Sequence, residues 1–173
     1  MNTAMIASLV AAATVAGAPP PSLPTTQAET ASGRSIVLPA AVAGRVGVLV
    51  VGFSKRSSDV TERWEARMAR DYGSSTRVSM LRVAVLESVP RLLRGFVRGR
   101  IERTVPAAKR DQFVFLFHQE DEWKSLVHFE APDDAYLVVL DADGKVAWRG
   151  HGAADLAGYE AMKGQIDGLL RGR

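Results

Sequence analysis

Two apolar runs separated by a short polar turn form the clearest pattern in this 173-residue chain. Tyr136–Leu140 is continuously apolar, as is typical of a strand covered on both faces of a sheet. Lys145–Arg149 alternates more between polar and apolar residues, which favours a strand with one covered face. Between them lies Asp141–Gly144, and a turn of this length rich in Asp and Gly predicts a hairpin.

Upstream of the hairpin, two valine-rich runs flank a helical pattern. Arg45–Phe53 and Val78–Leu86 are predicted to be buried strands. The helix between them is expected to begin at Ser58 or Asp59, where Asp59 and Glu62 resemble a capping box, and to end at Gly73. Strand, helix and strand in this order predict a right-handed crossover with the two strands parallel.

The remaining pattern completes an α/β order of β-α-β-α-β-α-β-β-α. A short entry segment, broken by Pro39, precedes the first long strand, and three helices and one strand occupy the other positions. The entry segment is Ile36–Gly44, the helices are Arg91–Arg103, Glu120–His128 and Ala153–Leu170, and the strand is Phe113–Phe117.

The N-terminal residues differ in composition from the rest of the chain. All 22 basic and 19 acidic residues lie beyond residue 28. Residues 4–18 form an apolar run that is too short to span a bilayer but has the length of a signal-peptide core. Residues 1–18 are therefore predicted to be a signal peptide, 19–34 a flexible linker and 35–173 the folded domain, in a protein that is exported and periplasmic or associated with the cell envelope. The alternatives are an alanine-rich leader and a misplaced start codon.

The composition limits the chemistry of the chain. It has no cysteine, which excludes disulfides, thiol catalysis and cysteine metal sites and leaves the redox compartment unreadable. A net charge of +3 is too small to indicate nucleic acid, and no nucleic-acid partner is expected. His118, His128 and His151 lack the spacing of a zinc motif, and Asp141 and Asp143 are assigned to the turn. No metal and no cofactor are predicted.

The order of elements resembles the thioredoxin-like superfamily: a three-layer α/β sandwich with a central mixed sheet, a C-terminal antiparallel hairpin and flanking helices. The hairpin sequence YLVVLDADGKVAWRGHG is similar to the ending of envelope thiol oxidoreductases and peroxiredoxins. It is more similar to the thioredoxin-like family of mitochondrial ATP synthase assembly factors, which also occurs in bacteria. This resemblance implies an assembly factor or chaperone of a membrane complex. The matching residues are Tyr136, Leu137, Asp141, Trp148, Gly150, Gly152, Ala153 and Glu160.

Two departures from the superfamily pattern bear on the chemistry. Redox-active members carry a cysteine in the loop after the first strand, and Ser58 and Thr61 stand at about that place here. A hydroxyl is a poor nucleophile unless a base activates it. The position of the usual cis-proline falls on Ala135, with Pro132 three residues away. The chain is therefore predicted to be a redox-inactive binding or assembly protein that acts on a membrane-associated partner.

Other interpretations of these residues remain open. Ser58, Asp59 and Thr61 are expected to cap the helix, and the alternative is an anion site formed with Lys55 and Arg56. A thioredoxin-fold enzyme with non-cysteine chemistry centred on Ser58, Thr61 and Arg56 is a second function, and a degenerate relative of envelope oxidoreductases is a third. Trp148 is expected to share a buried face with Val146, with an exposed recognition aromatic as the alternative.

The segment from residue 91 to 110 is strongly basic, with six arginines, one lysine and one glutamate. It also carries apolar residues at helical spacing. It is interpreted as a surface helix packed on the sheet or as a basic amphipathic surface for anionic lipid or an acidic partner. The candidate contact residues in it are Arg91, Arg94, Arg98, Arg100 and Arg103.

Overall fold

The computed structural model describes residues 22–172. The predicted signal peptide, residues 1–18, lies outside this range. Within it, no helix combines the length and the apolar character needed to cross a bilayer.

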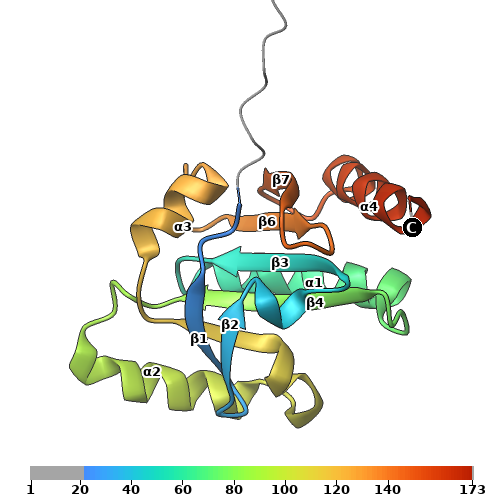
Figure 1. Cartoon of the computed structure of the whole chain (residues 1–173). Helices are drawn as coiled ribbons and strands as arrows, with labels where there is room; N and C mark the ends of the chain where they lie inside the picture. Colours follow the sequence, from blue (N-terminus) through green and yellow to red (C-terminus); the bar gives the residue numbers. More distant parts are fainter. Residues whose placement is uncertain (1–21, 173) are drawn as a thin grey trace, which may run out of the picture.

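A single mixed sheet forms the centre of the molecule (Figure 1). Its seven strands follow the order β2-β1-β5-β4-β3-β6-β7. β4 pairs in parallel with β3 and β5, as the predicted crossover requires, and β6 pairs antiparallel with β3 and β7. The strands are β1 Thr26–Thr30, β2 Ser35–Leu38, β3 Val46–Gly52, β4 Val78–Val85, β5 Phe113–Leu116, β6 Ala135–Leu140 and β7 Val146–His151.

Helices cover both faces of this sheet, which gives the three-layer α/β architecture expected from the sequence (Figure 1). α3 packs on one face through Trp123, and α1 and α4 pack on the other through Trp64 and Met162. The helices are α1 Ser57–Tyr72, α2 Arg91–Thr104, α3 Glu120–Val127 and α4 Leu156–Arg171, and η1 Ala40–Val42 and η2 Ala107–Gln112 are short 3₁₀ turns.

The alternation of side chains along the central strands explains why both faces are apolar. In β3, Leu49 and Val51 belong to the cluster under α3, whereas Val48 and Val50 belong to the cluster under α1 and α4. All of these side chains are fully buried. The continuous apolar run in the sequence therefore corresponds to a strand that is covered twice.

The prediction that residues 19–34 form a flexible linker is wrong for residues 26–30. Thr26–Thr30 is β1, which pairs antiparallel with β2 on one side and β5 on the other. Leu23 is only 4% exposed, and the indole N–H of Trp123 donates to the Thr26 hydroxyl over 3.2 Å. The polar composition of β1 resembles a linker because pairing with its neighbours, and not apolar content, holds it in place.

The hairpin forms where it was predicted, although β7 begins one residue and ends two residues later than expected, and it contains a β-bulge. Leu140 pairs with Val146 and Val139 pairs with Trp148, so Ala147 is the extra residue. The expectation that Trp148 and Val146 share a face is therefore wrong. Val146 belongs to the cluster under α3, whereas Trp148 is half-buried against the cluster under α1 and α4. The Trp148 ring lies against Gly150, where a β-carbon would collide with it.

Candidate functional site

The Ser54 side chain, and not Asp59, caps the start of α1, and it does so from two residues before the N-cap residue, Arg56. The Ser54 hydroxyl accepts hydrogen bonds from the backbone N–H groups of Arg56 and Ser57, over 3.0 and 3.1 Å. The helix begins at Ser57, and Asp59 is an exposed residue of its first turn. The predicted capping box is therefore wrong, because the helix begins one or two residues earlier than the pattern indicated.

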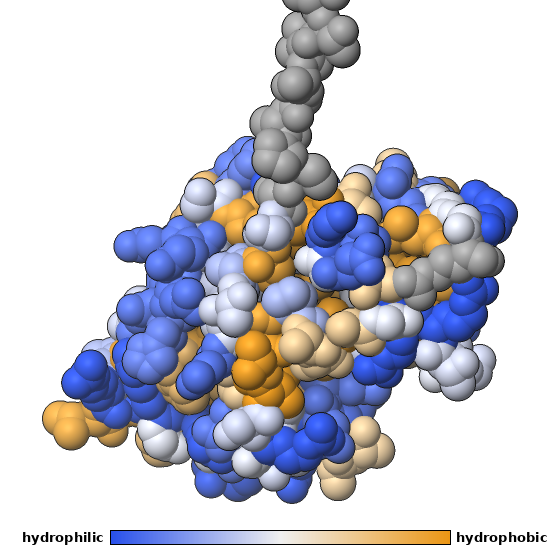
Figure 2. All heavy atoms as spheres, viewed as in Figure 1, coloured by the Kyte–Doolittle hydropathy of each residue, from blue (hydrophilic) through white to orange (hydrophobic). Residues whose placement is uncertain are grey.

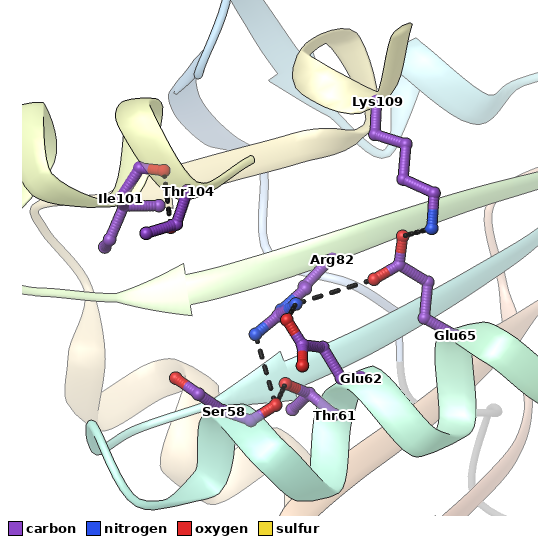
Figure 3. Close-up of polar contacts among 8 residues, drawn as sticks. All are labelled: Ser58, Thr61, Glu62, Glu65, Arg82, Ile101, Thr104 and Lys109. Atoms are coloured by element: carbon purple, nitrogen blue, oxygen red, sulfur yellow. Dashed lines mark hydrogen bonds and ion pairs between the residues drawn. The ribbon is translucent and has the colours of Figure 1, made fainter. Parts of the chain in front are cut away.

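Ser58 and Thr61 are hydrogen-bonded within the helix and not to a catalytic base. The Thr61 hydroxyl donates to the Ser58 carbonyl over 2.8 Å, and the same carbonyl accepts from the Arg82 guanidinium over 3.2 Å (Figure 3). Within the described part of the chain, neither hydroxyl is hydrogen-bonded to a histidine or a carboxylate. The geometry therefore gives no support to hydroxyl chemistry at this place.

The loop before α1 meets the loop before β6 at the carboxyl end of β3, because Gly52 pairs with Ala135. We call this region the loop edge: residues 53–57, residues 130–135 and His151. The Ser54 hydroxyl donates to Asp133 over 2.8 Å, and the Arg56 guanidinium lies 3.5 Å from the same carboxylate. Asp133 thus occupies the place beside Arg56 where an external anion was considered. Lys55 is exposed, and its side chain makes no hydrogen bond or ion pair with the described residues.

His151 joins the loop edge through two carboxylates. Its Nδ1 lies 2.9 Å from Asp134, its Nε2 lies 3.6 Å from Glu130, and its ring stacks on Tyr136. The sequence analysis missed this grouping. The hairpin register could have revealed it, since Tyr136 pairs with His151 and therefore places the histidine beside the residues that precede β6.

Aromatic packing fixes the backbone of the same loop. Phe53, Phe129 and Tyr136 form a cluster with ring centroids 5.1 to 5.6 Å apart. The Tyr136 hydroxyl accepts from the N–H groups of Glu130 and Ala131 and donates to the Ala131 carbonyl. These bonds hold the segment leading to Ala135, the position of the usual cis-proline. Ala135 is fully buried, and its carbonyl accepts from the Gly152 N–H.

A partly buried ionic cluster lies between α1 and η2, over β4 (Figure 3). Arg82 lies 3.4 Å from Glu62 and 3.5 Å from Glu65, and Lys109 lies 3.0 Å from Glu65. The side chains of Arg82 and Glu65 are 13% and 10% exposed. Because each charge has its partner, the cluster is structural, and it fixes the face of α1 that follows Ser58 and Thr61.

The five arginines proposed for α2 fall into two groups. Arg94 donates to the carbonyls of Val89 and Glu87 and lies over the Phe117 ring. Arg98 is paired with Glu29 at 2.8 Å and with Glu102 at 2.5 Å, and the hydrogen bond to Glu102 raises the pKa of its guanidinium. These two side chains hold the helix to the body of the protein and are not available to a partner.

The other three arginines accompany exposed apolar side chains. Arg91, Arg100 and Arg103 are exposed and have no ionic partner among residues 22–172. No residue of α2 is buried, and Leu92, Leu93 and Phe96 are 97%, 52% and 66% exposed. We call these six residues the α2 face. In Figure 2 the hydrophobic group at the far lower left lies at the N-terminal end of this helix.

The described residues contain no group of three or more histidine, aspartate or glutamate side chains arranged to hold a metal ion. A cavity of about 580 Å³ is lined by Arg34, Arg45, Tyr72, Val78 and Lys109 among others. Val78 begins β4, so this cavity lies at the opposite end of the parallel strands from the loop edge.

The strand order and the flanking helices give the described residues a thioredoxin-like fold. No protein-family model matches the chain, and no curated protein sequence matches it. Solved structures with the same fold include a thiol:disulfide interchange protein of the thioredoxin family from Chlorobium tepidum. It has a TM-score of 0.54 at 12% identity, over 90% of this chain and 99% of that one.

Two other solved structures extend the comparison. BsSco, a member of the Sco family of cytochrome c oxidase assembly proteins, has a TM-score of 0.61 at 11% identity, over 87% of this chain and 94% of that one. The pneumococcal exposed lipoprotein thioredoxin Etrx1 from Streptococcus pneumoniae has a TM-score of 0.56 at 10% identity, over 83% and 98%. These likenesses establish the shared fold.

Proposed function

We propose that this chain is a redox-inactive thioredoxin-like binding protein of the cell envelope that assists the assembly of a membrane-associated protein partner. The observation that carries the proposal is the structural role of Ser54 at the start of α1. Ser54, which follows β3, caps α1 and bonds Asp133, and the chain has no cysteine. The loop in which redox-active members carry their thiol has a structural role here, so contact and not electron transfer is the function left to the loop edge.

The composition of the loop edge suits a protein ligand. Lys55 and Arg56 are exposed on one loop, and Asp133 and Glu130 are exposed on the other, around the partly buried aromatic cluster. Mixed charges around an apolar centre confer specificity on a protein–protein contact. The resemblance of the hairpin to ATP synthase assembly factors, and the likeness of the fold to an oxidase assembly protein, support an assembly role.

Site-specific photocrosslinking tests this proposal. A photoreactive residue at Lys55 in the full chain should give a discrete adduct with a protein of the membrane fraction. The matched control is Thr76, which is equally exposed but lies in the α1–β4 loop at the opposite end of the parallel strands. Arg56→Glu should weaken the adduct at position 55. Equal adducts at both positions, or none at Lys55, would contradict the proposal.

A further inference from the structure

We infer that the α2 face is a membrane-docking surface that lies on an anionic lipid bilayer. The inference rests on the proposed function, because it supplies the means by which the protein stays beside a membrane-associated partner. It assigns a separate surface to lipid and leaves the loop edge to protein.

The α2 face exposes large apolar side chains. Leu92 is 97% exposed and Phe96 is 66% exposed, although both lie in a regular helix. Residues four apart share a helix face, so these two side chains lie one above the other. The helix contacts the body of the protein through a different set of residues, Val97 and Ile101, which pack on the phenylalanines of β5. The apolar residues of the α2 face are therefore surplus to the fold.

The α2 face also carries positive charge that no carboxylate of the described residues balances. Arg100 and Arg103 continue the same face by one and two turns, Arg91 precedes it, and none of the three has an ionic partner among the described residues. The one carboxylate of the helix, Glu102, is neutralised by Arg98. The surface is thus positive without internal compensation, and it complements an anionic surface.

The combination of apolar and basic side chains on the α2 face favours lipid over an acidic protein as its partner. Leucine and phenylalanine at the centre, with arginines beside them, is the composition of helices that lie in the interface of a bilayer. The apolar groups enter the boundary of the acyl chains while the guanidinium groups remain among the phosphates. An acidic protein surface would satisfy the arginines but would leave Leu92 in contact with charged groups.

The test is flotation of the full chain with vesicles of phosphatidylglycerol and phosphatidylcholine in equal parts, and with phosphatidylcholine alone. Binding is expected with the first and not with the second, and it should fall as salt rises toward about 0.5 M, where exposed charges are screened. A basic residue beside an anionic surface strengthens binding about fivefold. Arg100→Glu with Arg103→Glu should therefore weaken partitioning by roughly 30-fold or more.

Matched controls separate the α2 face from general charge and from the N-terminal segment. Arg63→Glu with Arg70→Glu changes two exposed arginines of α1 and should leave partitioning within twofold. Leu92→Ser with Phe96→Ser should weaken it by roughly 100-fold, because each large side chain contributes about tenfold. Leu156→Ser, which changes another exposed leucine, should have no effect. Circular dichroism verifies folding of each variant.

Three outcomes would overturn the inference. Equal flotation of all variants would assign membrane binding to another part of the chain. Failure of the wild-type chain to float, together with a change in its sedimentation on Leu92→Ser and Phe96→Ser, would make the α2 face a contact between copies. Failure to float, with loss of the Lys55 adduct in the Arg100→Glu and Arg103→Glu variant, would make it a protein contact. Because the adduct at Lys55 reports the loop edge itself, it can persist when lipid binding fails.

Discussion

The Ser54 hydroxyl connects three parts of the loop edge. It accepts from two backbone N–H groups at the start of α1 and donates to Asp133 in the loop before β6. A hydroxyl can make these contacts together because it has one proton and two lone pairs. A thiol would hold them more weakly, since sulfur is a poor donor and acceptor. At this position the chain therefore uses a serine to hold the loop in order.

Removing this hydroxyl should lower stability and loosen the loop edge. We expect Ser54→Ala to reduce the free energy of unfolding by about 1 kcal/mol, the usual value of a lost helix cap. The measurement is urea unfolding followed by circular dichroism. Ser58→Ala is the control, because its hydroxyl has no hydrogen bond within the described residues, and it should change stability by less than about 0.5 kcal/mol. Equal losses in the two variants would refute the capping role of Ser54.

At the scale of whole elements, the apolar strands and the covering helices were predictable and the polar strand was not. Strands such as β3 and β6 are fully buried, so their composition alone marks them. By contrast, β1 is formed by pairing with a strand far along the chain, and its Glu29 makes an ion pair with Arg98 of α2. Long-range pairing of this kind leaves no local sequence pattern. The β-bulge, which turns the Trp148 side chain to the opposite face of the sheet from the predicted one, leaves none either.

The packing of α4 against α1 depends on a polar contact as well as on apolar side chains. The Tyr72 hydroxyl, at the end of α1, donates to Asp167 of α4 over 2.6 Å, and Lys163 lies 3.2 Å from the same carboxylate. The hydrogen bond from Tyr72, with Lys163 beside it, lowers the pKa of Asp167. Burial and the neighbouring carboxylate raise the pKa of Tyr72, so that it remains a donor at neutral pH.

Tyr72→Phe should therefore destabilise the protein in a pH-dependent manner. We expect a loss of about 1 kcal/mol near pH 7, because the carboxylate loses a hydrogen bond. A carboxylate whose pKa is lowered by folding stabilises the protein above its unfolded pKa of about 3.9, and this contribution disappears as the pH falls through the lowered value. The difference between variant and wild type should thus be complete at neutral pH and shrink below about pH 4. Denaturant unfolding at several pH values measures it, and a difference that persists unchanged in acid would contradict the role of Asp167.

On the scale of the molecule, two surfaces at separate places have different origins in the sequence. The charge of α2 was visible as a run of arginines, but only the fold divides them into two that hold the helix and three that face outward. The loop edge was expected around Ser58, yet it is built from Ser54, Asp133 and His151. These residues come from three segments, and strand pairing alone brings them together.

The face of the sheet under α1 carries two apolar clusters with the Arg82 cluster between them. Arg82 projects from β4, lies over the Phe113 ring and contacts Glu62, Glu65 and the Ser58 carbonyl. Arg82 thereby couples α1 to β4. The α2 and η2 segments also pack against this part of the sheet. Because Arg82 and Glu65 are almost buried, their effect on stability should depend on whether one charge or both are removed.

Arg82→Met should destabilise the protein by about 3 kcal/mol, since it leaves the nearly buried Glu65 with Lys109 as its remaining cation. Arg82→Met combined with Glu65→Leu should recover most of this loss, because two apolar side chains of similar size need no desolvated charge, and Lys109 is exposed enough to turn to solvent. Arg63→Met, which removes an exposed arginine of α1, the helix that carries Glu65, should change stability by less than about 0.5 kcal/mol. Urea unfolding of these three variants and of Glu65→Leu alone measures these differences. A double variant as unstable as the sum of its two single changes would show that the charges act separately, and the coupling between α1 and β4 would then rest on apolar packing alone.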